Sequence, residues 1–316
     1  MKRFILAMLC FALVPLVPAS CEPIRWVNFD VPYESLQYAM NVDVESMDQE
    51  KHISWIDILA VAACRTGGRC PLSSVKVASR DLHSNRDIET MLGELYKYYP
   101  YYKEAYSAVL GGLLGSFSIE KDGIRKPSYG LKAFSPVAAG YGYSHCSDFG
   151  NSRSFGFDRK HLGNDLMGDL GTPIVAVEGG IVEAMGWNRY GGWRIGVRSF
   201  DSKRYYYYAH LQKDHPFAEG LQIGDRVEAG QLLGFMGRTG YSDRENTNNI
   251  ETVHLHFGLQ LIFDESQKEC NNEIWVDVYP IVKLLHQHRC SYHKTDEGWK
   301  RVYNFEDLDI PNNFCP

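Results

Sequence analysis

The sequence predicts an α+β protein in which a helical N-terminal region precedes a mainly antiparallel β domain with an open groove. Up to about residue 125 apolar residues recur at helical spacing. Beyond that point glycine, tyrosine and alternating β-branched residues dominate, with turn signals at short intervals. The clearest pattern is Val253–Leu261, whose apolar residues alternate with His254 and His256 as in a half-buried strand.

Length and charge limit the functions that need to be considered. The 316 residues are 44% hydrophobic, which is enough for one large or two modest domains with their own cores. The net charge is −6 and no long basic run is present. Because nucleic-acid binding depends on neutralising phosphates, a nucleic-acid partner is not expected.

The first residues have the organisation of a secretory signal peptide, residues 1–19. Lys2 and Arg3 precede an apolar run, and small residues at Val17 and Ala19 suit a signal-peptidase site. Two alternatives remain, an uncleaved anchor and a lipoprotein in which a lipid on Cys21 attaches the chain to the membrane. All three place the remaining chain outside the cytoplasmic membrane.

The cysteine spacing argues against a structural zinc knuckle, because none of the eight cysteines forms a CxxC pair. Cys64 with Cys70, and Cys270 with Cys290, are close enough in sequence to suggest disulfides. The pairing itself is not readable from sequence.

Residues 20–125 are predicted to be a helical region without a catalytic constellation. Ser54 is placed to cap a helix that ends near Gly67, with Asp57 at its third position. Further helical patterns cover Asn85–Tyr98 and Tyr102–Leu114. We expect this region to pack on the next domain or to position it.

Residues 126–262 are predicted to be the β domain, and residues 263–316 a C-terminal helix with a polar, partly irregular tail. The helix is expected over Ile274–Cys290. The strands are expected, in chain order, at Pro173–Val177, Ile181–Trp187, Trp193–Phe200, Arg204–Leu211, Leu232–Met236 and Val253–Leu261.

Histidines and one aspartate at matching strand phases indicate a metal site. His254 and His256 leave the same side of their strand, and His161 lies four residues before Asp165 in a short segment. This pair and one more histidine would make the three-ligand set of a catalytic zinc, with one position left for water. Alternation in Arg204–Leu211 is expected to place Tyr206, Tyr208 and His210 on one face.

Other histidines have ordinary explanations. His145 and His215 are isolated, and we interpret them as hydrogen-bonded residues without a function. His286 and His288 also form an HxH pair, but in a helical pattern, where residues i and i+2 point in different directions. We therefore interpret that pair as surface.

The order HxxxD, then YAHL, then HLHF resembles the lysostaphin-type zinc peptidoglycan endopeptidases. The segments DFGNSRSFGFDRKHLGND, GTPIVAVEGGIVEAMGW and VEAGQLLGFMGRTG are also similar to that family, so the resemblance covers about residues 146–262. It implies a lysostaphin-like β-sheet fold in which His161, Asp165 and His256 hold Zn²⁺. It further implies that His254 and His210 form the catalytic pair and that peptidoglycan is the substrate. Within this pair we assign the role of general base to His254 and stabilisation of the oxyanion to His210.

The chain departs from the family pattern at two places. The segment Tyr241–Val253 is longer than the usual turn before the last strand, and Gly258 stands where an acidic residue is common. The longer segment is expected to border the groove and to influence which bond is cut.

Two other functions were considered. A catalytically silent relative that binds cell wall or a partner protein would usually lack ligands, whereas this chain keeps all five residues. A lipoyl or biotinyl carrier would need a lysine after Met185, where this chain has Gly186, so the carrier interpretation fails.

Overall fold

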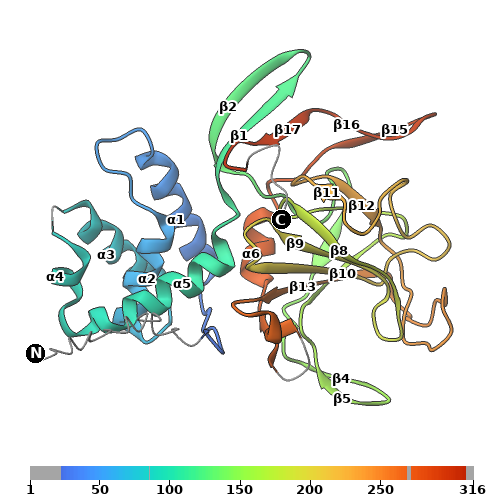
Figure 1. The fold of residues 1–316 in the computed structure, drawn as a ribbon, viewed down its shortest axis with the longest axis horizontal. Helices are drawn as coiled ribbons and strands as arrows, with labels where there is room; N and C mark the ends of the chain where they lie inside the picture. The colour runs from blue at the N-terminus through green and yellow to red at the C-terminus, as the bar shows by residue number, and fades with distance from the viewer. Residues whose placement is uncertain (1–22, 85, 269–271, 311–316) are drawn as a thin grey trace, which may run out of the picture.

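A computed structural model gives the structure of the protein and describes residues 23–84, 86–268 and 272–310 (Figure 1). The predicted signal peptide, Cys10, Cys21, Cys270 and Cys315 lie outside these residues. Within the described residues, no helix has the length and apolar character needed to cross a membrane.

The N-terminal part is a cluster of helices, as predicted. Its α-helices and one 3₁₀ helix are α1 (Tyr33–Ser46), α2 (Trp55–Thr66), α3 (Leu72–His83), α4 (Ile88–Leu92), η1 (Gly93–Tyr98) and α5 (Tyr99–Leu110). Ser54 caps α2 through a hydrogen bond from the Ile56 amide, and Gly67 ends it in a left-handed conformation. Asp57 does not complete a capping box, because it accepts the Tyr99 hydroxyl instead.

Strands begin earlier than the change in composition suggests. The segment that follows α5 forms a hairpin of β1 (Leu114–Lys121) and β2 (Ile124–Leu131), although the helical region was predicted to reach residue 125. β17 (Asn304–Asp307) pairs with β1 and completes a three-stranded sheet beside the main domain (Figure 1). The partner strand is far away in sequence, so local periodicity carries no sign of this pairing.

The main domain is built on one antiparallel sheet with the strand order β11-β8-β9-β10-β13-β6-β3, in which β14 also pairs with β13. Its strands are β3 (Tyr143–His145), β6 (Asn164–Gly168), β8 (Gly180–Asn188), β9 (Gly192–Ser199), β10 (Arg204–Ala209), β11 (Arg226–Val227), β13 (His254–Leu261) and β14 (Ile274–Val276). Short strand pairs also lie outside this sheet, among them β4 (Ser152–Phe155) with β5 (Phe157–Lys160) and β7 (Pro173–Val175) with β12 (Leu232–Phe235). Every predicted strand is present, and β13 lies near the centre of the sheet.

The C-terminal prediction was partly wrong. Residues Ile274–Cys290 are not one helix, because β14 takes the first residues and only α6 (Tyr279–Leu285) is helical. The predicted irregular tail contains β15 (Tyr292–Thr295), which pairs with β16 (Gly298–Arg301), and then β17. Helix α6 packs against α1 at the junction of the helical and β parts (Figure 1).

Cys64 and Cys70 do not form the disulfide suggested for them, and the suggested partner of Cys290 lies outside the described residues. Cys64 and Cys70 are buried free thiols, and Cys290 is also a buried free thiol. Burial raises the pKa of Cys64 to about 11 and that of Cys70 to about 12, so both remain protonated at neutral pH. Cys64 and Cys70 serve as small apolar core residues of the helical part.

Candidate metal centre

The first two candidate ligands come from one short segment that leads into β6. His161 directly follows β5, and Asp165 lies in β6 four residues later. Both side chains are buried, with 6% of each residue exposed. Asp165 is the direct cross-strand neighbour of His256 in β13, so the sheet register itself brings this segment to the double-histidine strand.

Strand β13 carries both histidines on one face, as its alternation predicts. The intervening Leu255 is fully buried on the opposite face, and Phe257 is 1% exposed. Both histidines line the open groove on the other side of the sheet. Because β10 and β6 flank β13, the backbone that carries His256 is fixed from both sides.

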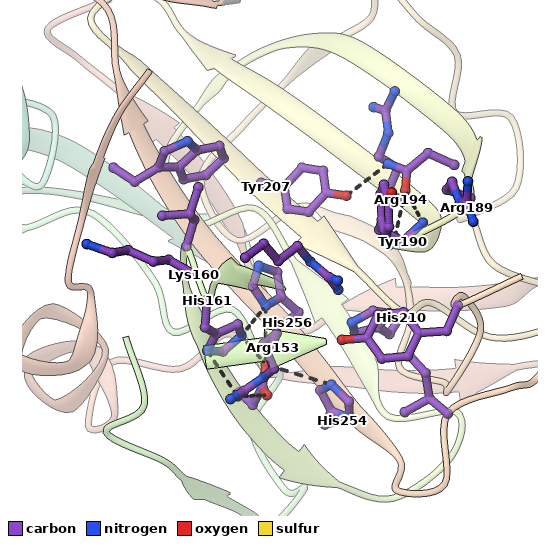
Figure 2. A pocket seen from close by; sticks show the side chains of 18 of the residues that line it. Arg153, Lys160, His161, Arg189, Tyr190, Arg194, Tyr207, His210, His254 and His256 are labelled. Atoms are coloured by element: carbon purple, nitrogen blue, oxygen red, sulfur yellow. Dashed lines mark hydrogen bonds and ion pairs between the residues drawn. The ribbon is translucent and has the colours of Figure 1, made fainter. Parts of the chain in front are cut away.

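His161, Asp165 and His256 converge on one point. The Nε2 atom of His161 lies 2.7 Å from Nδ1 of His256 and 3.0 Å from Oδ1 of Asp165, and His256 Nδ1 lies 3.2 Å from the same oxygen. One ligand atom from each residue falls within 4.8 Å of the others, and among the described residues this is the one such group of histidine, cysteine and acidic side chains. Figure 2 shows the His161 and His256 rings side by side. The structure therefore brings together the three residues for which the resemblance implies a metal role.

The chemistry of this group fits a divalent cation. His161 Nδ1 lies 3.1 Å from the backbone carbonyl oxygen of Asp148, so the ring donates there and presents the lone pair of Nε2 to the cluster. Burial would raise the pKa of Asp165, but its close contacts with the imidazole rings of His161 and His256 outweigh burial and lower that pKa strongly. A buried, ionised carboxylate facing two imidazole nitrogens is a ligand set that zinc accepts.

Two residues behind the cluster were not identified from the sequence. The Nη2 atom of Arg153, in β4, contacts Oδ2 of Asp148 at 2.6 Å and Oδ2 of Asp165 at 3.2 Å. Asp148 also accepts the backbone amide of Asp165 through Oδ1. Both residues belong to the run DFGNSRSFGF, which was noticed only as an approach to His161; an acidic residue paired with an arginine there was the available signal.

His210 joins the groove by a route that strand alternation does not predict. Strand β10 ends at Ala209, and His210 has a left-handed backbone with φ of 61°. Tyr206 and Tyr208 were expected on its face, but both are buried in the core, whereas Tyr205 and Tyr207 line the groove. The prediction was wrong because the positive φ turns His210 out of the strand's alternation.

His210 and His254 lie side by side at the open end of the cluster. Their ring centroids are 4.8 Å apart, and His254 Nε2 lies 3.7 Å from Oδ1 of Asp165 (Figure 2). Burial, together with the neighbouring charges of His254 and His256, holds the pKa of His210 well below its usual range. His210 is therefore neutral at neutral pH.

The groove around these residues is a single cavity of 1090 Å³. Its wall includes Asn249, Ile250, Glu251 and Thr252 from the long segment before β13, in agreement with the prediction that this segment borders the groove. Tyr207 stands over His256 with 5.8 Å between ring centroids.

The four histidines set aside in the sequence do not join the cluster. His145 lies against the Tyr279 ring, and His215 is exposed. His286 is exposed as expected, whereas His288 is half-buried and stacks on Phe134, so the surface interpretation was wrong for His288.

The fold and the converging side chains define a metallopeptidase domain of the lysostaphin type, as the sequence resemblance predicted. Residues 159–270 match the model of Peptidase family M23, so the chain carries an M23 peptidase domain in this region. A crystal structure from Ruminococcus gnavus ATCC 29149, provisionally described as a glycyl-glycine endopeptidase lytM, covers 85% of this chain and 92% of its own with a TM-score of 0.54. At 24% identity this likeness establishes the fold alone.

Curated relatives match over the peptidase region. The L-Ala–D-Glu endopeptidase of Bacillus subtilis (strain 168) is 41% identical over 117 residues, which is 37% of this chain and 34% of that protein. The glycyl-glycine endopeptidase ALE-1 of Staphylococcus capitis is 38% identical over 98 residues, which is 31% of this chain and 24% of that protein. The chain thus spans about a third or less of the length of these relatives.

Proposed function

We propose that this protein is a zinc-dependent endopeptidase that hydrolyses peptide bonds in the cross-links or stem peptides of peptidoglycan, outside the cytoplasmic membrane. The observation that carries the proposal is the convergence of His161, Asp165 and His256 beside the His210–His254 pair in an open groove. The relatives named as endopeptidases support the reaction class. Residues 126–262 would form the peptidase domain.

His161, Asp165 and His256 would hold the zinc ion. When bound, zinc supplies Lewis-acid chemistry, lowering the pKa of a water molecule and polarising the scissile carbonyl. Asp148 and Arg153 would keep this set in place through the His161 ring and the Asp165 carboxylate.

His254 would act as the general base. Its Nδ1 lies 2.9 Å from the Thr252 carbonyl oxygen, to which it donates, so Nε2 carries a lone pair directed at the reaction centre. That nitrogen can take a proton from the attacking water and pass it to the leaving amine.

His210 needs a proton before it can serve the oxyanion. Its Nδ1 donates to the Thr239 carbonyl oxygen at 2.9 Å, which leaves Nε2 of the neutral ring as an acceptor. We propose that His210 takes up a proton from solvent in the groove as the oxyanion forms, stabilises the developing negative charge as an N–H donor, and returns the proton to solvent when the products leave.

The proposal is tested by incubating the purified protein, without its predicted signal peptide, with peptidoglycan in the presence and absence of a chelator. We expect new amino termini that disappear on chelation and return with zinc, and about one zinc ion per chain by elemental analysis. Release unaffected by chelation would refute metal-dependent hydrolysis. Metal binding without new amino termini would instead favour a silent, wall-binding relative.

A further inference from the structure

The hairpin β4–β5 places two arginines directly opposite each other at the groove. Arg153 and Arg159 are cross-strand partners, and both line the cavity. Like charges at opposed positions of a hairpin are destabilising unless other charges neutralise them. Arg153 is neutralised by Asp148 and Asp165. Arg159 has no ion pair with any described residue.

Aromatic rings hold the Arg159 guanidinium in place without using its hydrogen-bond donors. Its central carbon lies 4.7 Å from the Tyr190 ring centroid and 5.1 Å from that of Tyr241. The Nη1 atom is buried and has no hydrogen-bond partner among the residues that the structure describes. A buried guanidinium nitrogen without an acceptor is costly, and a planar carboxylate is the group that matches its paired N–H donors.

This guanidinium lies beside the reaction centre. Tyr241, which contacts Arg159, is also 6.0 Å from His210 between ring centroids. Figure 2 shows Tyr190 and His210 facing the same groove as the candidate metal ligands. A group bound by Arg159 would therefore be separated from the catalytic pair by a single aromatic ring.

We propose that Arg159, framed by Tyr190 and Tyr241, binds an ionised carboxylate that the substrate carries next to the scissile bond. This inference rests on the proposed endopeptidase function and narrows its substrate class to acidic stem peptides, in preference to uncharged glycine bridges. Tyr190 and Tyr241 orient the guanidinium, and Arg159 acts as a specificity residue.

The test uses defined peptides that differ only in charge. Stem peptides with free carboxylates are compared with versions amidated at D-glutamate, at diaminopimelate or at both, and with pentaglycine; kcat/KM is measured by mass spectrometry of the products. We expect about a tenfold or greater preference for one free carboxylate, and the single amidations identify which one. The preference should shrink as salt is raised.

Variants of Arg159 and of a second groove arginine distinguish binding by Arg159 itself from a general effect of positive charge in the groove. Arg159→Met should lower kcat/KM for the acidic peptide towards that of its amidated form, whereas Arg159→Lys should keep part of the preference. Arg189 lies in the same groove but already pairs with Asp243 at 3.3 Å, so Arg189→Met removes the same charge and should leave the preference intact. Melting temperatures confirm that each variant is folded.

The outcomes distinguish this inference from the proposed function. Equal rates on acidic and amidated peptides, or a preference that survives Arg159→Met, would overturn the carboxylate subsite while leaving the endopeptidase function intact. If no peptide is cut, the proposed function fails, and calorimetric binding of the acidic and amidated peptides then decides the subsite. Tighter binding of the acidic peptide that requires Arg159 supports it, and equal or absent binding refutes it.

Discussion

Backbone carbonyl oxygens orient three of the four histidines at the candidate site. His161 contacts the carbonyl of Asp148, His254 that of Thr252 and His210 that of Thr239, in each case through Nδ1. Because a carbonyl oxygen can only accept, all three rings present Nε2 to the groove. His256 differs, since its Nδ1 faces Asp165. The main chain thus sets the tautomer of His161, His254 and His210.

At the residue scale, metal binding and turnover should separate by substitution. His161→Ala removes a ligand and should lower bound zinc well below one ion per chain, with loss of activity. His254→Ala should keep the zinc and lower kcat about 10²–10⁴-fold, since it removes a general base. Elemental analysis and a peptidoglycan-release assay measure the two quantities.

The exposed His215 provides the control for this series, and His215→Ala should change neither quantity. Full zinc in His161→Ala would contradict the ligand assignment. Loss of zinc in His254→Ala would move that residue from the catalytic pair into the ligand set.

At the scale of elements, the site depends on a close approach of two neighbouring backbone segments at Gly163 and Gly258. A Cβ atom on Gly258 would lie 2.8 Å from the Leu162 carbonyl oxygen and 2.8 Å from the Trp275 ring. One on Gly163 would lie 2.6 Å from the Phe257 carbonyl oxygen and 2.8 Å from the His256 ring. Glycine at both positions lets the segment that carries His161 lie close against β13.

Gly258→Ala should therefore push the His161 segment away from β13. We expect overpacking to lower the free energy of unfolding by about 1–3 kcal/mol. Zinc affinity should fall about tenfold or more, because the ligands move apart. Denaturant titration and competition with a zinc-binding dye measure these. Gly142→Ala is the control, since a Cβ there meets nothing within 4 Å. Unchanged zinc affinity in Gly258→Ala would show that the close backbone approach at Gly258 does not position the ligands.

Sequence patterns predicted those elements whose signals are local. The alternation in β13 gave the correct faces for His254 and His256, because both edges of that strand are paired and its backbone stays regular. Alternation failed at His210, where a positive φ ends the regular strand. It also missed the pairing of Phe117 with Asp307, because contacts between distant segments leave no local periodicity.

The residues of the site could be predicted only in part, because some of their contacts depend on the fold and not on local sequence. The HxxxD spacing and the HxH strand are contiguous motifs, so His161, Asp165 and His256 stand out in the sequence. Arg153 reaches them through the fold of the β4–β5 hairpin, and its closeness to Asp148 in the sequence indicates an ion pair but not a contact with Asp165.

At the scale of the whole molecule, the helical part and the sheet share one hydrophobic core. The same cluster of buried side chains includes Leu110 at the end of α5 and Ile195 in β9. Arg204 crosses this junction with 1% of the residue exposed. It donates to the Ala108 carbonyl oxygen at 2.8 Å and to Glu178 at 2.7 Å. A buried charge thus ties the last helix before the β region to the sheet.

This arrangement predicts that one substitution at Arg204 destabilises both parts together. Arg204→Met removes the cation and leaves Glu178 buried without its partner, which typically costs about 3–5 kcal/mol. Urea unfolding is followed by circular dichroism, which reports on the helices, and by tryptophan fluorescence. The unfolding midpoints of both signals should move to lower urea concentrations. Arg65→Met, which breaks the partly exposed pair with Asp81 on the helical part, should cost no more than about 1 kcal/mol.

A second substitution tests whether the unpaired Glu178 carboxylate causes the loss of stability in Arg204→Met. Glu178→Gln in the Arg204→Met background removes the orphaned charge while keeping an acceptor for the Tyr206 hydroxyl, which lies 2.6 Å from the carboxylate. The double variant should therefore be more stable than Arg204→Met alone. If the two spectroscopic signals separated already in the unsubstituted protein, the helical and β parts would unfold independently, and the shared core would not couple them.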